Sequence, residues 1–224
     1  MYSVGIAMTD LEAAIERAIP EINFLTIATP DMMPGALLES RRIDHYIGRI
    51  EPFLIPPLTP ADFETERQPA AVNLQSLSTE RSGQSAIALL QMFGLNLTGI
   101  GISTIEAISV RLQLEAVTMQ RFKSGIGKLQ FERALRSLKE RDPRAFRLLK
   151  DHFLVLATYY ARDFRLTFGQ ELLNAIDLDT KLQSSARSHI QRWGNTVWVS
   201  QNETLPFGVF GYEITQGRTI LETD

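Results

Sequence analysis

The sequence predicts an α+β domain, and three observations support this fold class. Residues 106–122 and the second half of residues 153–168 alternate apolar and polar side chains with the period of two that is typical of β-strands. Residues 128–142 instead carry apolar side chains at helical spacing. The chain has 224 residues, of which 44% are hydrophobic, so it is large enough to bury its own core.

The first 50 residues mix one predicted helix with short extended elements. Thr9 and Asp10 can cap a helix over residues 11–19, and Pro20 ends or kinks that helix. A run rich in β-branched residues then predicts a strand. The extended elements predicted here are a strand over residues 22–29, an element over residues 35–40 and a strand over residues 43–50.

Residues 51–70 contain five of the chain's ten prolines. Proline neither donates a hydrogen bond to a strand ladder nor continues a helix. We therefore predict an extended surface connection here. A strand-like pattern resumes over residues 71–77.

The most unusual stretch is residues 82–105, which contain no charged side chain. A membrane-spanning helix needs about 20 mostly apolar residues. Four glycines and several polar side chains make this stretch a poor spanning helix. We predict a buried helix or strand pair in the resting protein.

Residues 106–122 form the clearest predicted strand. Apolar side chains occupy the even positions from Ile108 to Ala116, and polar side chains occupy the odd positions between them. At Val117 the pattern changes phase, so that Val117 and Met119 are apolar instead. Such a change predicts a β-bulge or an end of strand pairing.

Two more long elements follow. Residues 128–142 are predicted to form a helix with a basic outer face, and Pro143 breaks it. Residues 153–168 are predicted to form a strand whose first half is apolar on both faces. The inward residues predicted for the helix are Leu129, Leu135 and Leu138.

The last part of the chain is predicted to contain a helix and a closing hairpin. Phe210, Tyr212 and Ile214 share one face of the final strand. The predicted elements are a helix over residues 171–193, hairpin strands over residues 196–200 and 205–215, and a tail over residues 216–224.

The composition excludes several functions. The net charge is -3, which argues against bulk affinity for nucleic acid, and there is no cysteine for a disulfide or a thiolate. The N-terminus lacks the pattern of a signal peptide, so we expect a cytosolic protein. The three histidines are far apart and no G-x-S-x-G motif is present, so we expect neither an enzyme nor a metal or other cofactor. The Gly-rich residues 125–128 lack the spacing of a phosphate-binding loop.

Two strands have the pattern of membrane β-strands, which need roughly 9–11 residues that alternate apolar and polar. Residues 107–116 satisfy this pattern, and residues 158–168 satisfy it less cleanly. A single chain with so few strands must share them with other copies, because an open sheet edge in lipid leaves backbone groups unpaired. A half-buried sheet in a soluble protein produces the same alternation, so both interpretations stay open.

Several phrases follow one another between residues 20 and 215. They are INFLTIAT (22–29), MPGALL (33–38), YIGRI (46–50) before the proline-rich loop, GLNL within residues 89–101, the strand over residues 154–168, and LPFGVF (205–210). In this order they resemble bacterial gasdermins, relatives of the pore-forming domain of animal gasdermins. The resemblance implies a twisted, mostly antiparallel central sheet with surrounding helices over residues 1–215, followed by a short C-terminal tail.

The resemblance also implies a function. Such proteins rest as soluble, cytoplasmic monomers until an associated protease removes a short C-terminal segment. The freed domain then binds membrane lipids, forms a homo-oligomer and opens a β-barrel pore in the inner membrane, which kills the infected cell and limits phage spread. An activating protease and membrane lipids are therefore the expected partners, and nucleic acid is not one.

On this interpretation three sets of residues have roles. The membrane-inserting set is Leu89, Leu95, Leu97, Ile108, Val110, Leu112, Leu114, Phe164, Leu166 and Phe168. The basic set facing anionic lipid is Arg133, Arg136, Lys139, Arg141, Arg144 and Arg147, which an ordinary solvated helix face would equally explain. The candidate cleavage site is Arg218 in the tail.

The sequence departs from the family in two respects. Many bacterial members carry an acylated N-terminal cysteine, and this chain has no cysteine. The tail after Thr215 is short, so restraint by residues 216–224 alone is not expected. Two alternatives to a pore stay open: a soluble α+β interaction or regulatory module without membrane activity, and an enzyme whose site is assembled from scattered residues.

Overall fold

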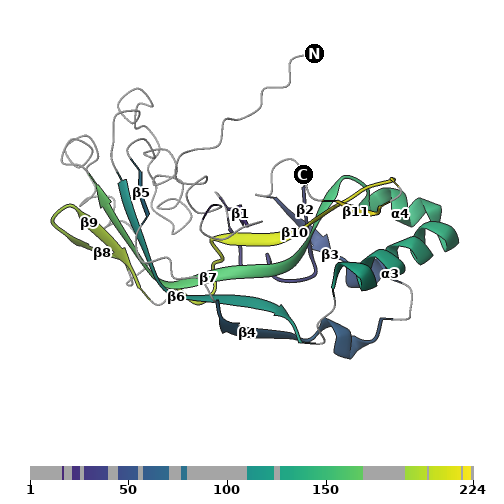
Figure 1. The fold of residues 1–224 in the computed structure, drawn as a ribbon, viewed down its shortest axis with the longest axis horizontal. Coiled ribbons are helices and arrows are strands. Elements are labelled where there is room, and N and C mark those ends of the chain that lie inside the picture. The colour runs from purple at the N-terminus through teal and green to yellow at the C-terminus, as the bar shows by residue number, and fades with distance from the viewer. Residues whose placement is uncertain are drawn as a thin grey trace, which may run out of the picture. The chain divides into compact units, whose positions relative to one another are not determined.

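The computed structural model describes residues 17, 22–25, 28–39, 45–54, 58–70, 77–79, 110–123, 127–168, 190–200, 202–217 and 219–222. The strands and the helices α3 and α4 are labelled in Figure 1, and all elements within these residues are given next with their bounds. They are β1 (Asn23–Phe24), β2 (Ala36–Glu39), β3 (Tyr46–Arg49), the 3-10 helices η1 (Glu51–Phe53) and η2 (Pro60–Phe63), β4 (Thr65–Pro69), β5 (Leu77–Thr79), β6 (Val110–Phe122), α3 (Lys128–Arg141), α4 (Pro143–Leu149), β7 (His152–Phe168), β8 (Ile190–Trp193), β9 (Thr196–Val199), β10 (Gly208–Ile214) and β11 (Leu221–Glu222).

The chain divides into two compact units that are interleaved along the sequence. Unit 1 comprises residues 1–27, 71–117 and 161–203, and unit 2 comprises residues 28–70, 118–160 and 204–224. The division falls inside β6 and inside β7, so each of these long strands supplies residues to both units. The single domain predicted over residues 1–215 stays a prediction.

In unit 2 the first half of β7 lies between two antiparallel neighbours. Strand β10 pairs with it from Gly208 opposite Tyr159 to Glu213 opposite Phe153. On its other side β2 pairs with β7, and β3 pairs with β2. Because both edges and both faces of this half are covered, five successive side chains from Phe153 to Ala157 are all buried, as its two-sided apolar sequence predicts.

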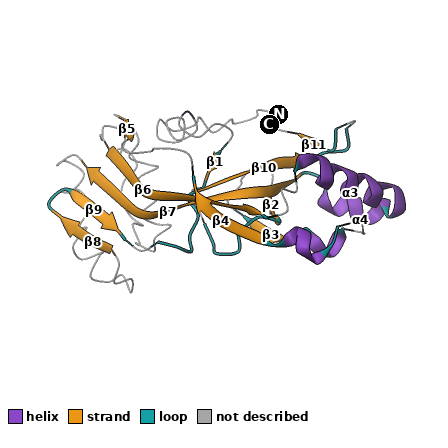
Figure 2. Cartoon of the chain, turned by 60° about the horizontal axis from the view of Figure 1, so that its bottom comes forward, coloured by secondary structure: helices purple, strands orange, loops and turns teal. Residues whose placement is uncertain are grey.

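Helices α3 and α4 complete the core of unit 2. Figure 2 shows them lying side by side. Asp142 lies between them, and its side chain accepts hydrogen bonds from the backbone N–H groups of Arg144 and Ala145, which caps α4. A buried cluster in unit 2 combines helix, strand and C-terminal residues: Leu37, Ile50, Phe122, Phe131, Leu135, Leu138, Phe146, Leu149, Leu154, Leu156, Ile214, Ile220 and Leu221.

In unit 1 the described strands form two antiparallel sets. Strand β5 pairs with the start of β6, with Leu77 opposite Leu112 and Thr79 opposite Val110. The second half of β7 pairs with β9, and β9 pairs with β8 through the Gly194 turn. Strand β6 also pairs with β7, so all these strands belong to one sheet.

Several sequence predictions are confirmed. Residues 128–141 are helical as α3, and β6 and β7 are the long strands predicted over residues 106–122 and 153–168. Phe210, Tyr212 and Ile214 do share a face, because the first two pack against the cluster that contains Ile214. The predictions for residues 11–19, apart from Arg17, and for residues 82–105 and 171–189 lie outside the described residues.

Four predictions are wrong. Residues 51–70 are not only a connection, because Thr65–Pro69 form β4 and pair with β6; Pro69 is tolerated at the end of the strand. Ile190–Trp193 form strand β8 rather than the end of a helix. The strands β9 and β10 do not form a hairpin with each other, since each pairs with a different half of β7. Leu129 is 57% exposed, because the inward face of α3 is set by Phe131, Ala134, Leu135 and Leu138.

Candidate functional site

The apolar faces of β6 and β7 in unit 1 carry four of the predicted membrane-inserting side chains. Leu112 and Leu114 of β6 are buried, whereas the flanking residues Arg111 and Glu115 are exposed. In β7, Phe164 and Leu166 are fully buried. The predicted alternation is therefore present, and in this state its apolar members are turned into the protein.

The phase change predicted at Val117 is an irregularity in the backbone of β6. Ala116 has a φ angle of +51°, in the left-handed region that non-glycine residues rarely adopt. Ala116 is exposed while the next residue, Val117, is buried, so the buried side of the strand changes here. The partner changes too, because β5 pairs with β6 as far as Leu112 and β4 pairs with it from Thr118.

Helices α3 and α4 bring together the predicted basic side chains. The exposed members are Arg133, Arg136, Arg141, Arg144 and Arg147, and Lys139 is half-buried. Arg147 Nε donates to the Pro143 carbonyl oxygen at 3.2 Å, and Lys139 Nζ donates to the Gln216 carbonyl oxygen at 3.1 Å. Residues 128–151 hold eight basic and four acidic side chains, a net charge of +4 in a chain whose net charge is -3.

Two exposed leucines lie among these basic side chains. Leu129 on α3 is 57% exposed and Leu148 on α4 is 67% exposed. Leu129 shares its side of α3 with Arg133 and Arg136, which follow at helical spacing. Leu148 adjoins Arg147 and lies one turn after Arg144. The helical pair thus presents a basic surface with two apolar side chains on it.

The C-terminal residues 216–222, named here the C-terminal strap, are packed against unit 2. Strand β11 pairs with β10, with Leu221 opposite Ile214 and Glu222 opposite Glu213. Ile220 and Leu221 are buried in the core cluster. In contrast Gln216, Gly217 and Thr219 are exposed. The strap therefore combines an exposed turn with a buried end, and Figure 1 shows β11 running beside β10 near the two helices.

No protein-family model matches the sequence. No curated protein matches it either. Among solved structures, a bacterial gasdermin from Bradyrhizobium tropiciagri is similar over 93% of this chain and 88% of that chain, with a TM-score of 0.50 and 16% sequence identity.

The chain has the fold of a bacterial gasdermin. The predicted fold class, an α+β protein with a mostly antiparallel sheet, is confirmed with it. At this level of identity the likeness concerns the fold alone, so each functional role stays a prediction.

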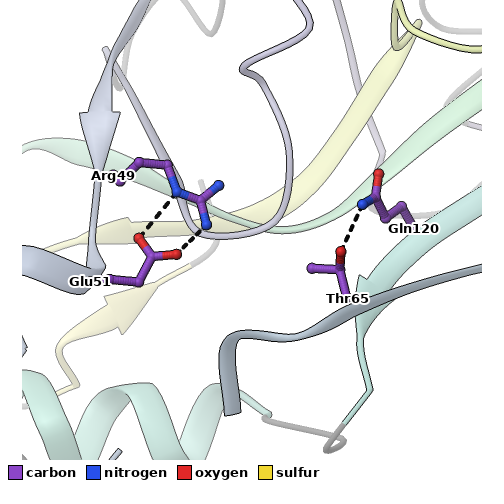
Figure 3. A network of polar contacts seen from close by, with 4 residues as sticks. All are labelled: Arg49, Glu51, Thr65 and Gln120. Carbon is purple, nitrogen blue, oxygen red and sulfur yellow. Dashed lines mark hydrogen bonds and ion pairs between the residues drawn. The ribbon is translucent and has the colours of Figure 1, made fainter. Parts of the chain in front are cut away.

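The gasdermin fold places a polar network where β4, β6 and β7 meet in unit 2. Gln120 Nε2 donates to Thr65 Oγ1 at 2.8 Å (Figure 3), and Tyr160 OH donates to Gln120 Oε1 at 3.2 Å. The Arg67 guanidinium lies 3.8 Å from the centre of the Tyr160 ring. Burial raises the pKa of the Tyr160 phenol above its ordinary value of 10.0, and the nearby Arg67 partly opposes that rise. No local sequence pattern predicts this network, because its members come from three distant segments.

A second polar contact in the gasdermin fold fixes a turn of unit 2. Arg49 and Glu51 form a two-point ion pair, in which Arg49 Nε donates to Glu51 Oε2 at 3.1 Å and Nη2 contacts Oε1 (Figure 3). Gly35 lies against this pair with a φ angle of +88°. The positive φ angle favours glycine here, and a Cβ at Gly35 would also meet Arg49 Nη2 at 2.7 Å and displace the end of that side chain.

The remaining predicted site residues cannot be compared with side-chain positions. Leu89, Leu95, Leu97, Ile108 and Arg218 lie outside the described residues. Val110 and Phe168 lie at the ends of the described β6 and β7, where the backbone alone is described. All seven stay predictions.

Two findings concern functions other than a pore. No helix within the described ranges has both the length and the hydropathy needed to cross a membrane. In those same ranges, no three histidine, aspartate or glutamate side chains come together as a potential metal site.

Proposed function

We propose that this chain is a membrane pore-forming effector of bacterial cell death, acting in anti-phage defence, and that it is not an enzyme. It rests as a soluble cytoplasmic monomer, and proteolysis of the C-terminal strap lets it oligomerise in the inner membrane. The observation that carries this proposal is the gasdermin fold, with long two-faced strands whose apolar side chains are buried at rest.

The two-faced strands support the step into the membrane. In lipid, every backbone N–H and C=O group must be paired, so strands from many copies have to join edge to edge. The side chains of Leu112, Leu114 and Leu166 would then exchange protein neighbours for lipid, and the polar positions between them would face the wet interior. Leu89, Leu95, Leu97, Ile108, Val110, Phe164 and Phe168 complete this set.

The basic surface of α3 and α4 supports docking on anionic lipid. Each basic residue near an anionic membrane surface contributes about 1 kcal/mol. Leu129 and Leu148 would enter the boundary between headgroups and acyl chains, as the apolar side chains of interfacial helices do.

The C-terminal strap supports a restraint that cutting removes. Ile220 and Leu221 hold it by their burial and by pairing with β10, while Gln216 and Gly217 lie in an exposed turn. A cut in this turn, with Arg218 as the candidate position, leaves the buried end held only by non-covalent contacts. Its departure would uncover the β10 edge and the core residues beneath it.

Dye release from vesicles tests the proposal. A recognition sequence for a site-specific protease is inserted between Gln216 and Gly217, because a truncated chain would lack Ile220 and Leu221 during folding. We expect dye release from vesicles containing phosphatidylglycerol only after cutting. Dye release without cutting would contradict the proposal that the strap restrains the protein. Intact vesicles in the presence of cut, folded protein would favour the soluble interaction module.

Charge reversal tests the lipid-docking surface separately. Arg144→Glu with Arg147→Glu changes exposed side chains, so the fold should persist. We expect at least about a tenfold loss of binding to anionic vesicles. The matched control is Arg111→Glu with Arg121→Glu, two exposed arginines of β6 outside the helical surface. An equal loss in both double variants would show a general charge effect rather than a docking surface.

A further inference from the structure

The outer face of the β7–β9–β8 strands in unit 1 carries the chain's two tryptophans. Strand pairing puts Arg165 opposite Trp198 and Thr167 opposite Thr196, with Gln191 opposite Trp198 on the next strand. Trp193 lies opposite Thr196, so it shares the face of Trp198. The two indole rings are 5.1 Å apart between centroids.

The opposite face of these strands is part of the protein interior. Phe164 and Leu166 of β7, and Val197 and Val199 of β9, have no exposed surface. The face that carries the two tryptophans is therefore directed outward, because the side chains of the opposite face are packed in the interior. Trp193 is 62% exposed, an unusual position for the largest apolar side chain. Trp193, Trp198 and Arg165 are named here the tryptophan face.

Two hydrogen-bond donors on the tryptophan face lack acceptors within the described part of the chain. Trp198 Nε1 and Arg165 Nε are both buried atoms without a partner. Arg165 is otherwise held in place, because its Nη2 contacts Glu115 Oε1 at 3.1 Å and its guanidinium lies 5.5 Å from the Trp198 ring centre. A buried N–H group without an acceptor costs free energy.

We propose that the tryptophan face binds the interfacial layer of a phospholipid bilayer. This inference rests on the proposed function, because it requires that the protein reaches a membrane. Tryptophan concentrates at membrane interfaces, where its ring meets the acyl-chain boundary and its N–H meets polar groups. The ester carbonyl and phosphate oxygens of that layer are acceptors for indole N–H groups, and the indole of Trp193 is exposed. The face thus anchors unit 1 on the membrane surface before the strands insert, independently of the basic surface of α3 and α4.

Intrinsic fluorescence tests this directly, because Trp193 and Trp198 are the chain's only tryptophans. The protease-cleavable full chain is mixed with phosphatidylglycerol-containing vesicles before and after cutting, and binding, dye release and emission are recorded together. We expect a blue shift of the emission on binding, and quenching by phospholipids that carry bromine near the carbonyl end of the acyl chains. The variants Trp193→Phe and Trp198→Phe each retain one tryptophan, so each reports the emission of the remaining indole, and both keep an aromatic ring at the substituted position.

The functional variant is Trp193→Ser, which removes the exposed ring. We expect vesicle binding to weaken about tenfold, since burial of such a side chain is worth that much or more. Two controls are matched: Gln191→Ser on the same strand and face, and Ile47→Ser, which removes an apolar side chain that is 50% exposed on β3. Neither control should weaken binding as much.

The outcomes separate this inference from the proposed function. Dye release with unchanged emission and no bromolipid quenching would overturn the tryptophan face and leave the pore intact. A blue shift without bromolipid quenching would assign the face to contact between copies of the chain, which also overturns it. Failure of vesicle binding and dye release in every condition would overturn both. Equal weakening by Trp193→Ser and Ile47→Ser would show general apolar adhesion and contradict the inference.

Discussion

The two halves of β7 differ in how they are packed. Its first half, in unit 2, is buried on both faces and has neighbours on both sides. Its second half, in unit 1, buries Phe164 and Leu166 but leaves Arg165 partly exposed on the other face. One continuous strand thus serves as the centre of one unit and as a two-faced sheet strand in the other. A two-faced strand can exchange its neighbours without leaving apolar groups in water on both sides, whereas a doubly covered strand cannot.

The largest predicted effect tests the packing of the first half. Gly211 lies where β10 shifts register against β7, and a Cβ there would meet the Leu154 carbonyl oxygen at 2.0 Å. We expect Gly211→Ala to lower the free energy of unfolding by about 3 kcal/mol or more, because the backbone has to move. Denaturant unfolding measures this. The control is Gly48→Ala, where a Cβ meets nothing within 4 Å; a similar loss there would contradict the comparison.

The next effect tests the strap as part of the unit 2 core. Leu221 is fully buried, so Leu221→Ala should lower the free energy of unfolding by about 2–4 kcal/mol. Glu222→Ala, which changes an exposed residue on the same strand, should have little effect. Thermal and denaturant unfolding of both variants measures the difference. Equal stability of the two variants would show that the strap is dispensable to the core.

A smaller effect concerns Ala116, the residue at which the buried side of β6 changes. Ala116 adopts a positive φ angle that costs an alanine roughly 1 kcal/mol and glycine almost nothing. Ala116→Gly should therefore raise the free energy of unfolding by about 0.5–1 kcal/mol. Gln113→Gly, in the same strand without a positive φ angle, should lower it. Destabilisation by both substitutions would show that Ala116 is not strained.

The smallest effect is a pH dependence at Tyr160, in the part of β7 that belongs to unit 2. The pKa of Tyr160 is raised by burial, so the folded protein keeps the neutral phenol while the unfolded chain ionises it. Its stabilising contribution is present below pH 10.0 and decreases as the pH rises above that value. Tyr160→Phe should remove this part of the pH dependence. Parallel unfolding measurements at neutral pH and above pH 10.0 compare the two proteins, and identical slopes would contradict the assignment.

Local patterns in the sequence were sufficient for the elements that depend on local periodicity. Helix α3, the two long strands and the irregularity at Ala116 all follow from spacing and phase. The apolar alternation of Leu112 and Leu114 was visible for the same reason. The inward position predicted for Leu129 failed because a helix end offers fewer turns to define the buried face.

Pairing between distant segments was decided only by the tertiary structure. The proline-rich segment yields β4 because β6 offers it an open edge, and Ile190–Trp193 become β8 because β9 offers another. Strands β9 and β10 join different halves of β7 rather than each other. The burial of Ile220 and Leu221 likewise depends on α3 and β10. The sequence by itself thus determined the fold class and the two-faced strands, since these are set by neighbours a few residues apart. Which strands meet, and what the strap covers, depend on contacts between residues far apart in the chain, and no local pattern encodes them.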